Sequence, residues 1–138
     1  MVCIYCKNLT RVVNSRTKAR TPSTWRRRRC TKCVAQFSTV ELPDFRGSLS
    51  VRRDLKHLDP FLRDKLFISI YKALGHRPTA LDDTSALANT IISKLLKSPQ
   101  AIDGIILRPQ IALVVYETLK RFDTAGSATY KAYHNDVL

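Results

Sequence analysis

The stretch WRRRRCTKC, from Trp25 to Cys33, places four consecutive arginines directly before a pair of cysteines. A second pair lies in VCIYC at residues 2–6, so the four cysteines follow the pattern C-x2-C-x23-C-x2-C. Two C-x2-C pairs about two dozen residues apart are typical of a tetrahedral four-thiolate zinc site. We therefore expect one Zn2+ per chain, held by Cys3, Cys6, Cys30 and Cys33.

The expected metal has a structural role. Four thiolates close the tetrahedral shell and leave no position for a catalytic water. A segment of about 45 residues also has too little apolar area to fold unaided, so metal binding would supply most of its folding free energy. The alternative is that the cysteines form a pair of redox-active disulfides.

The residues around the cysteine pairs predict a three-stranded β ribbon over residues 1–42. Arg11–Ser15 and Trp25–Arg29 are interpreted as two extended arms around a polar turn that contains Pro22. After the second pair, VAQFSTVEL at 34–42 alternates apolar and polar residues, as a half-buried third strand does. Trp25 suits either a base-stacking position or the core of the ribbon, and we favour the core.

Positive charge is concentrated in the same segment. The formal net charge is +13, and residues 1–46 hold 11 of the 24 lysines and arginines but 2 of the 11 acidic residues. Such an excess favours a polyanionic partner such as nucleic acid or an acidic membrane surface. A solvated basic tail is the ordinary interpretation of an arginine run, but the attachment of this run to Cys30 favours a rigid cationic patch.

A rigid patch of this kind can neutralise several phosphates. Successive side chains of a strand point to alternate faces, so Arg26 and Arg28 would point one way and Arg27 and Arg29 the other, and the four cannot all meet one ligand. The candidate nucleic-acid-binding residues are Arg11, Arg16, Lys18 and Arg20 on the first arm and turn, and Arg26, Arg27, Arg28 and Arg29 on the second arm.

Residues 43–60 mark a change in pattern. LPDFRGS, with Pro43 and Gly47, predicts a linker over residues 43–48. The alternation that follows predicts a short β-hairpin near residues 49–58. Asp59 and Pro60 then suit the N-cap and the first position of a helix.

Helical periodicity dominates the rest of the chain. Apolar residues at helical spacing predict a first helix that runs to Leu74 and further helices at about 81–97 and 109–122, the last with Phe122 facing inward. A short final helix is expected around ATYKAYH, with Tyr130 and Tyr133 on one side. The expected fold class is α+β: a small N-terminal β zinc ribbon followed by a mainly helical domain with a short N-terminal β-hairpin.

The segments VCIYC, VVNSR, RRRRC, TKC and FSTVE, followed by SVRRD, DPFLRDKL and LKRFD, occur in an order that resembles the NrdR family, bacterial repressors of ribonucleotide reductase genes. The resemblance implies that residues 1–42 bind double-stranded operator DNA in a promoter. It also implies that residues 49–138 form an ATP-cone. This small helical domain binds ATP or dATP and links nucleotide state to the form of a homo-oligomer.

The resemblance places a nucleotide site at the first turn of the cone. Family members read close to V-V-K-R-D-G there, and this chain has SVRRDL at residues 50–55. The implied nucleotide-binding residues are Arg52, Arg53 and Asp54, together with Lys65, which matches a first-helix lysine that reaches phosphate. Leu55 stands where the family has a glycine that allows a tight bend, so we expect a reshaped turn.

Two other classes of function were weighed against repression. A zinc-ribbon protein that binds RNA or the ribosome would share the charge and the metal, and it is the alternative. An enzyme is not expected, because the histidines are isolated along the sequence and no P-loop signal is present. No apolar run approaches bilayer length and no secretory signal is found, so we expect a cytoplasmic protein. The resemblance implies that it is bacterial and associated with the nucleoid.

Overall fold

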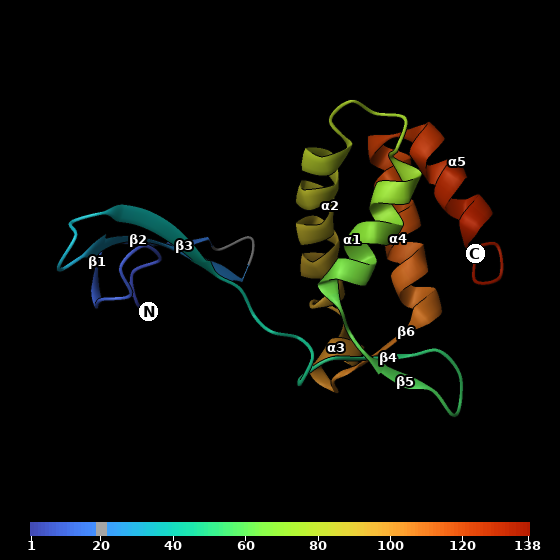
Figure 1. Ribbon diagram of the computed structural model, residues 1–138. Coiled ribbons are helices and arrows are strands. Elements are labelled where there is room, and N and C mark those ends of the chain that lie inside the picture. Colours follow the sequence, from blue (N-terminus) through green and yellow to red (C-terminus); the bar gives the residue numbers. More distant parts are fainter. Residues whose placement is uncertain (19–21) are drawn as a thin grey trace. The chain divides into compact units, whose positions relative to one another are not determined.

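The computed structural model describes residues 1–18 and 22–138, and it divides the chain into two compact units, residues 1–43 and 44–138 (Figure 1). The boundary lies at the start of the segment that we expected to be a linker. Residues 44–48 are not a free linker but pack against the rest of the second unit, because Phe45 lies edge-on against Phe61 with ring centroids 5.8 Å apart. Ser48 and Leu49 also donate backbone hydrogen bonds to the carbonyl of Phe45.

The first unit is a three-stranded antiparallel sheet. Its strands are β1 (Thr10–Lys18), β2 (Ser23–Cys30) and β3 (Gln36–Glu41), in the order β1-β2-β3. The arginine run occupies most of the central strand, and the ribbon expected from the sequence is confirmed. The predicted polar turn falls largely on residues 19–21, so Arg20 lies outside the described residues.

A β-bulge interrupts the pairing of β1 with β2. Val12 pairs with Arg28, but the next pair joins Asn14 to Arg27, so Val13 is an extra residue on β1. An extra residue reverses the alternation of faces beyond it. Arg11 and Arg16 are five positions apart and would otherwise lie on opposite faces, and the bulge places them on the same one.

The second unit begins with a small mixed sheet. β4 (Ser50–Arg52) and β5 (Leu58–Pro60) form the antiparallel hairpin that the sequence predicts, and β6 (Ile105–Leu107) pairs with β4 in parallel. We did not predict β6. The sheet has the order β5-β4-β6, so the hairpin is one edge of a structure completed from a distant part of the chain.

Helices make up the remainder of the second unit. α1 (Arg63–Ala73), α2 (Ala80–Leu95), α4 (Arg108–Phe122) and α5 (Thr124–Tyr133) pack side by side, α1 against α2 and α5, and α4 against the same two helices. The short helix α3 (Pro99–Ile102) leads into β6, and the sheet lies at one end of the helices (Figure 1). Within the described residues, the helices are too short or too polar to cross a bilayer.

The start of α1 differs from the prediction. Asp59 and Pro60 are not an N-cap and first helical residue, because they pair with Val51 and Ser50 in the hairpin. Helix α1 begins at Arg63, with Leu62 in the N-cap position. The local preference of this dipeptide is for a helix start, but strand pairing holds it in the hairpin instead.

Two aromatic residues that we expected on apolar helix faces are exposed. Phe122 is 42% exposed, and the guanidinium of Arg77 lies over its ring at 4.8 Å from the centroid. Tyr133 is 64% exposed, whereas Tyr130 is buried. The predicted inward position is therefore wrong for Phe122, and the two tyrosines do not share an environment.

Asp123 joins the last helix to the turn after α1. Its carboxylate accepts a hydrogen bond from the backbone N–H of Gly126 at 2.7 Å and so caps the start of α5. The same carboxylate lies 2.9 Å from Nη1 of Arg77 and 3.2 Å from Nε2 of His76. These contacts, first among them the hydrogen bond from Gly126, lower the pKa of Asp123 to about 2.

Candidate metal centre, cationic sheet and cavity

The four cysteines lie together at one end of the ribbon. Their Sγ atoms are all within 4.8 Å of one another, with Cys3 and Cys33 at 3.7 Å and Cys6 and Cys30 at 3.4 Å. Zn–S bonds of about 2.3 Å place tetrahedral sulfurs about 3.8 Å apart, whereas a disulfide requires about 2.05 Å. The four thiols are free, and their spacing fits one Zn2+ rather than two disulfides.

The two cysteine pairs have the same local backbone. Lys7 and Val34 each follow the second cysteine of a pair, and both have φ of 61°. In the second pair, the backbone N–H groups of Lys32 and Cys33 donate to Sγ of Cys30 at 3.3 and 3.4 Å. Such hydrogen bonds favour the thiolate that a metal requires. In the first pair, a backbone hydrogen bond from Asn8 is the largest influence that lowers the pKa of Cys6 to about 6.

The cationic side chains are divided between the two faces of the sheet. We call the face that carries Cys30 and Phe37, both buried, the cysteine face. Arg26 and Arg28 lie on it, because they pair with Thr39 and Phe37 on β3. Glu41 on the same face holds both arginines: Oε1 lies 2.9 Å from Nε of Arg26 and 4.0 Å from Nη2 of Arg28.

The opposite face carries the other arginines among the described strand residues, and we call it the open face. Arg27 and Arg29 of β2 lie on it, beside Arg11, which pairs with Arg29, and Arg16, which pairs with Trp25. Arg11, Arg16 and Arg27 are exposed, and Arg29 is partly exposed. Among the described residues, the guanidinium of Arg27 donates to two neutral acceptors on β3, Gln36 and Ser38, at 3.4 Å each. The expected alternation of Arg26 to Arg29 is therefore present.

Trp25 is not a core residue of the ribbon. The buried cluster of the first unit consists of Cys3, Cys30 and Phe37, with Cys6 packed against it. Trp25 is half-buried on the open face, where its strand neighbours are Arg16 and Val40. The core position that we favoured from the sequence is therefore wrong, because Phe37 fills that role on the other face.

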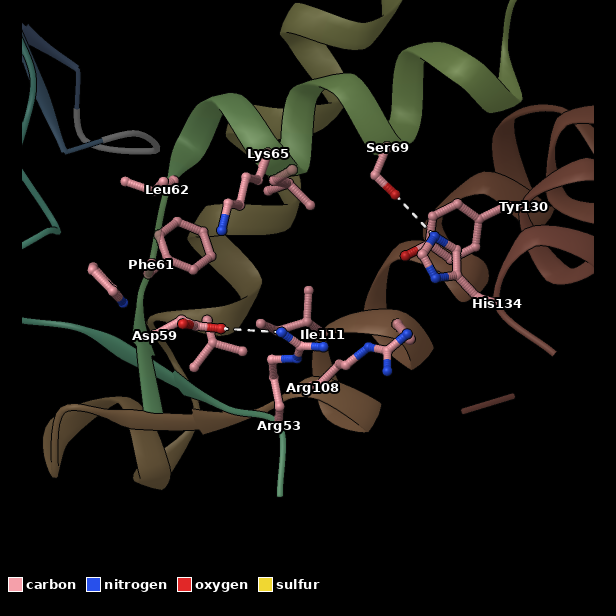
Figure 2. A pocket seen from close by; sticks show the side chains of 14 residues that line it. Arg53, Asp59, Phe61, Leu62, Lys65, Ser69, Arg108, Ile111, Tyr130 and His134 are labelled. Atoms are coloured by element: carbon pink, nitrogen blue, oxygen red, sulfur yellow. Dashed lines mark hydrogen bonds and ion pairs between the residues drawn. The ribbon is translucent and has the colours of Figure 1, made fainter. Parts of the chain in front are cut away.

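The second unit contains a cavity of about 360 Å3 between the hairpin, α1, α4 and the end of α5. Figure 2 shows Lys65 and Ser69 of α1 facing the same space as Arg53, Arg108, Tyr130 and His134. Phe61 and Ile111 supply apolar surface to its wall. A volume of this size, with apolar walls and a few convergent charged groups, is typical of a small-molecule site.

The structure brings two of the four predicted nucleotide-binding residues to the cavity. Arg53 and Lys65 line it, whereas Arg52 and Asp54 do not. Strand alternation puts Val51 and Arg53 on the cavity side and turns Arg52 away. Asp54 has a different role, since it accepts hydrogen bonds from the backbone N–H groups of Lys56 and His57 at 2.8 and 2.9 Å.

The hairpin turn is built without a glycine, and its reshaping relative to the family's turn stays a prediction. Positive φ angles at residues other than glycine occur at Lys7 and Val34 among the described residues, so Leu55 does not adopt one. The Asp54 side chain stabilises the turn instead, and its hydrogen bond with His57 is the main cause that lowers the pKa of Asp54 to about 2. Leu55 is left 95% exposed at the tip.

Three polar residues of the cavity wall, Ser69, Arg108 and His134, were not predicted from the sequence. Ser69 Oγ lies 3.0 Å from Nε2 of His134, whose ring is 4.3 Å from that of Tyr130. Burial, and next the charge of Arg108, lowers the pKa of His134. Tyr130 and His134 are four residues apart on α5, and this spacing was the available signal that they share a helix face. Arg108 Nη1 lies 3.0 Å from the carboxylate of Asp136.

Comparisons with known proteins agree with this arrangement. Residues 1–41 match the family model described as "Transcriptional repressor NrdR-like, N-terminal domain". Proteins named "Transcriptional repressor NrdR" are similar over nearly the whole chain. The relative from Tropheryma whipplei (strain Twist) is 30% identical over 138 residues, which cover 99% of this chain and 88% of the relative. The relative from Rhizobium etli is 32% identical over 137 residues, covering 99% and 84%.

A third relative with the same name, from Symbiobacterium thermophilum, is 28% identical over 136 residues and is covered over 88% of its length. The matches thus include both units, not the cysteine-rich unit alone. Together with the clustered cysteines and the three-stranded ribbon, they show that the chain belongs to the NrdR family of transcriptional repressors, with an N-terminal zinc ribbon.

Proposed function

We propose that this protein is a zinc-dependent, non-enzymatic repressor of ribonucleotide reductase genes in the bacterial cytoplasm. Residues 1–43, folded around one structural Zn2+, bind double-stranded operator DNA. Residues 44–138 bind ATP or dATP, and the bound nucleotide selects the homo-oligomeric form that represses. Family membership supports the overall role, and two features of this chain support the division of labour between its units.

The observation that carries the DNA-binding proposal is the attachment of the arginine strand to the four-thiolate cluster. β2 runs through four consecutive arginines into Cys30, so metal binding fixes the direction of those side chains. Fixed cations can neutralise a defined set of phosphates without first losing conformational freedom. A basic tail without the metal would bind polyanions with no fixed register.

A binding titration tests this proposal. Zinc-loaded protein is titrated against its own reductase promoter, a shuffled duplex of the same length and a structured RNA, each at several salt concentrations. We expect tighter binding to the promoter than to either competitor at matched salt, and loss of that preference after zinc removal. Equal or tighter binding to RNA would contradict the proposal and favour an RNA-binding role.

The cavity of the second unit supports the nucleotide proposal. Arg53, Lys65 and Arg108 bring three positive charges to a space whose walls also include Phe61 and Tyr130, as a ligand with phosphates and a flat base requires. Arg53 lies 3.8 Å from the carboxylate of Asp59, so a triphosphate would compete with an acid for it. Lys65 has no hydrogen-bond or ion-pair partner within the described part of the chain.

Calorimetric titration with ATP and dATP tests nucleotide binding. Lys65→Ala removes the unpartnered cation of the cavity, and we expect a loss of affinity of about 10-fold or more. Lys72→Ala is the matched control, because Lys72 lies on the same helix but does not line the cavity. The same samples, examined by light scattering, should change mass with nucleotide. Equal losses in both variants would contradict the assignment of this cavity.

A further inference from the structure

We infer that the open face of the ribbon contacts the duplex through Arg11, Arg16, Arg27 and Arg29, whereas Arg26 and Arg28 serve the ribbon itself. This inference rests on the proposed function and assigns the side chains that perform it. It divides a run of four identical residues into two pairs with different roles. The division follows from strand register, from ion pairing and from burial.

The charge environments of the two faces differ. Glu41 is the only acidic residue in residues 1–43, and it lies on the cysteine face. The open face therefore carries four guanidinium groups and no carboxylate within the described residues of the ribbon. A phosphate that approaches the open face meets attraction alone, whereas one that approaches the cysteine face also meets the charge of Glu41.

Arg26 and Arg28 are also less available than Arg11, Arg16 and Arg27 of the open face, which are exposed. The side chain of Arg28 is 12% exposed and that of Arg26 is 34% exposed, and both reach Glu41. Arg26 makes two contacts with this carboxylate, Nε to Oε1 at 2.9 Å and Nη2 to Oε2 at 3.1 Å. Nε of Arg28 donates to Thr39 as well, at 3.2 Å. These contacts tie β2 to the end of β3.

The β-bulge completes the open face. Because Val13 is an extra residue, Arg11 and Arg16 of β1 lie on the same face as Arg27 and Arg29 of β2. The four arginines lie on two adjacent strands, and neighbouring strands are about 4.8 Å apart. Their guanidinium groups therefore share one surface. A strand pair is an established way for a protein to present side chains to a duplex.

Three double variants with equal charge loss test the division. Arg27→Gln with Arg29→Gln and Arg11→Gln with Arg16→Gln act on the open face, and Arg26→Gln with Arg28→Gln acts on the cysteine face. Each phosphate contact contributes about 0.9 to the slope of log K against log salt, so each open-face double should reduce the slope by about 2. The cysteine-face double should leave the slope unchanged but release zinc faster to a chelator.

Two further variants test the division with Arg26, Arg28 and Glu41 all retained. Ser38→Glu adds an acid to the open face next to Arg27, and Thr39→Glu adds one to the cysteine face next to Arg26. Net charge is the same in both. We expect Ser38→Glu to weaken promoter binding at least about 10-fold at low salt and to reduce the slope by about 1, and Thr39→Glu to have little effect.

The outcomes separate this inference from the proposed function. Equal slope losses for the two faces, or equal weakening by Ser38→Glu and Thr39→Glu, would overturn the division while leaving duplex binding intact. A wild-type protein without preference for duplex DNA, or variants that all bind as wild type does, would overturn the proposed function as well.

Discussion

The two units of this chain reach a folded state by different means. Among the described residues, the buried cluster of residues 1–43 consists of Cys3, Cys30 and Phe37. The buried cluster of residues 44–138 contains 16 described residues, which lie in β6, in the four long helices and next to the ends of the helices and hairpin strands. Apolar burial of about 25 cal/mol per Å2 can stabilise the second unit, but three side chains cannot stabilise the first. We therefore expect the ribbon, and not the second unit, to depend on a bound metal for its fold.

The surfaces that result also differ. The ribbon has few apolar residues to bury and displays arginines from two adjacent strands, so we expect its interaction surface to be a sheet face. The second unit instead brings a few of its charged residues, Arg53, Lys65 and Arg108 among them, to a cavity between packed elements. An extended polyanion fits the first arrangement and a small ligand the second.

Zinc removal is the strongest test of the comparison. Cys30→Ser, or a chelator, should unfold residues 1–43, because metal binding contributes on the order of 10 kcal/mol to such a site. Helical circular dichroism from residues 44–138 should persist, with an unchanged thermal midpoint for that unit. A ribbon that keeps its protected amides without metal, or loss of the helices together with the metal, would contradict the distinction.

A core substitution in the second unit should destabilise that unit and leave the zinc site of the ribbon intact. Ile70 is fully buried and Ile68 is 52% exposed on the same helix, α1. Ile70→Ala should cost about 2–5 kcal/mol of unfolding free energy, and Ile68→Ala less than about 0.5 kcal/mol. Denaturant unfolding measures both values. Zinc content should stay at one per chain in each variant, and loss of zinc in Ile70→Ala would show that the units depend on each other.

Asp123 offers a smaller effect that depends on pH. Asp123→Ala removes the cap of α5 and should cost about 0.5–2 kcal/mol at neutral pH. The pKa of Asp123 is lowered to about 2, from about 3.9 in an unfolded chain, so its contribution is present above pH 4 and is lost as pH falls towards 2.

Unfolding curves between pH 2 and 7 check this dependence, since wild type and Asp123→Ala should converge at the acid end. Asp103→Ala, at the end of α3 and exposed, is the control and should follow wild type throughout. A constant difference between wild type and Asp123→Ala at every pH would show that the carboxylate charge is not the cause.

The smallest predicted effect concerns the backbone beside the metal. Val34 has φ of 61°, a conformation that is costly for a β-branched residue, so Val34→Gly should relieve about 1 kcal/mol of strain. Competition with a chelator should show an increase in zinc affinity of about five-fold. Lys7→Gly, at the equivalent position of the first cysteine pair, should give a smaller gain because lysine is not β-branched. A weaker zinc affinity in Val34→Gly would contradict the strain argument.

Sequence was most informative where structure is local. The spacing of Cys3, Cys6, Cys30 and Cys33 predicted their convergence, because a thiolate cluster is specified by short turns and one hairpin. Alternation correctly divided Arg26 to Arg29, since side chains of a strand have a period of two. The bulge at Val13 could not be foreseen, because nothing in the residues of β1 marks where pairing skips a position.

Sequence was less informative where distant segments meet. β6 is three residues long and forms a strand by pairing with β4, so no periodicity of apolar residues in the sequence indicated it. Asp59 and Pro60 are residue types that favour the start of a helix, and the helix start was predicted there. The prediction was wrong because pairing within the hairpin decides their conformation. The cavity draws on residues from 51 to 134, and Ser69, Arg108 and His134 have no shared signal along the chain.

The parallel pair of β4 with β6 has a consequence for the order in which the chain acquires its structure during synthesis. Residues 1–43 contain every contact of the ribbon sheet, so this unit can fold as soon as it leaves the ribosome and finds zinc. β4 must wait for a partner about 50 residues later, and the cavity waits longer still, for Tyr130 and His134. Under the function proposed above, a nascent chain would bind DNA before it could respond to a nucleotide.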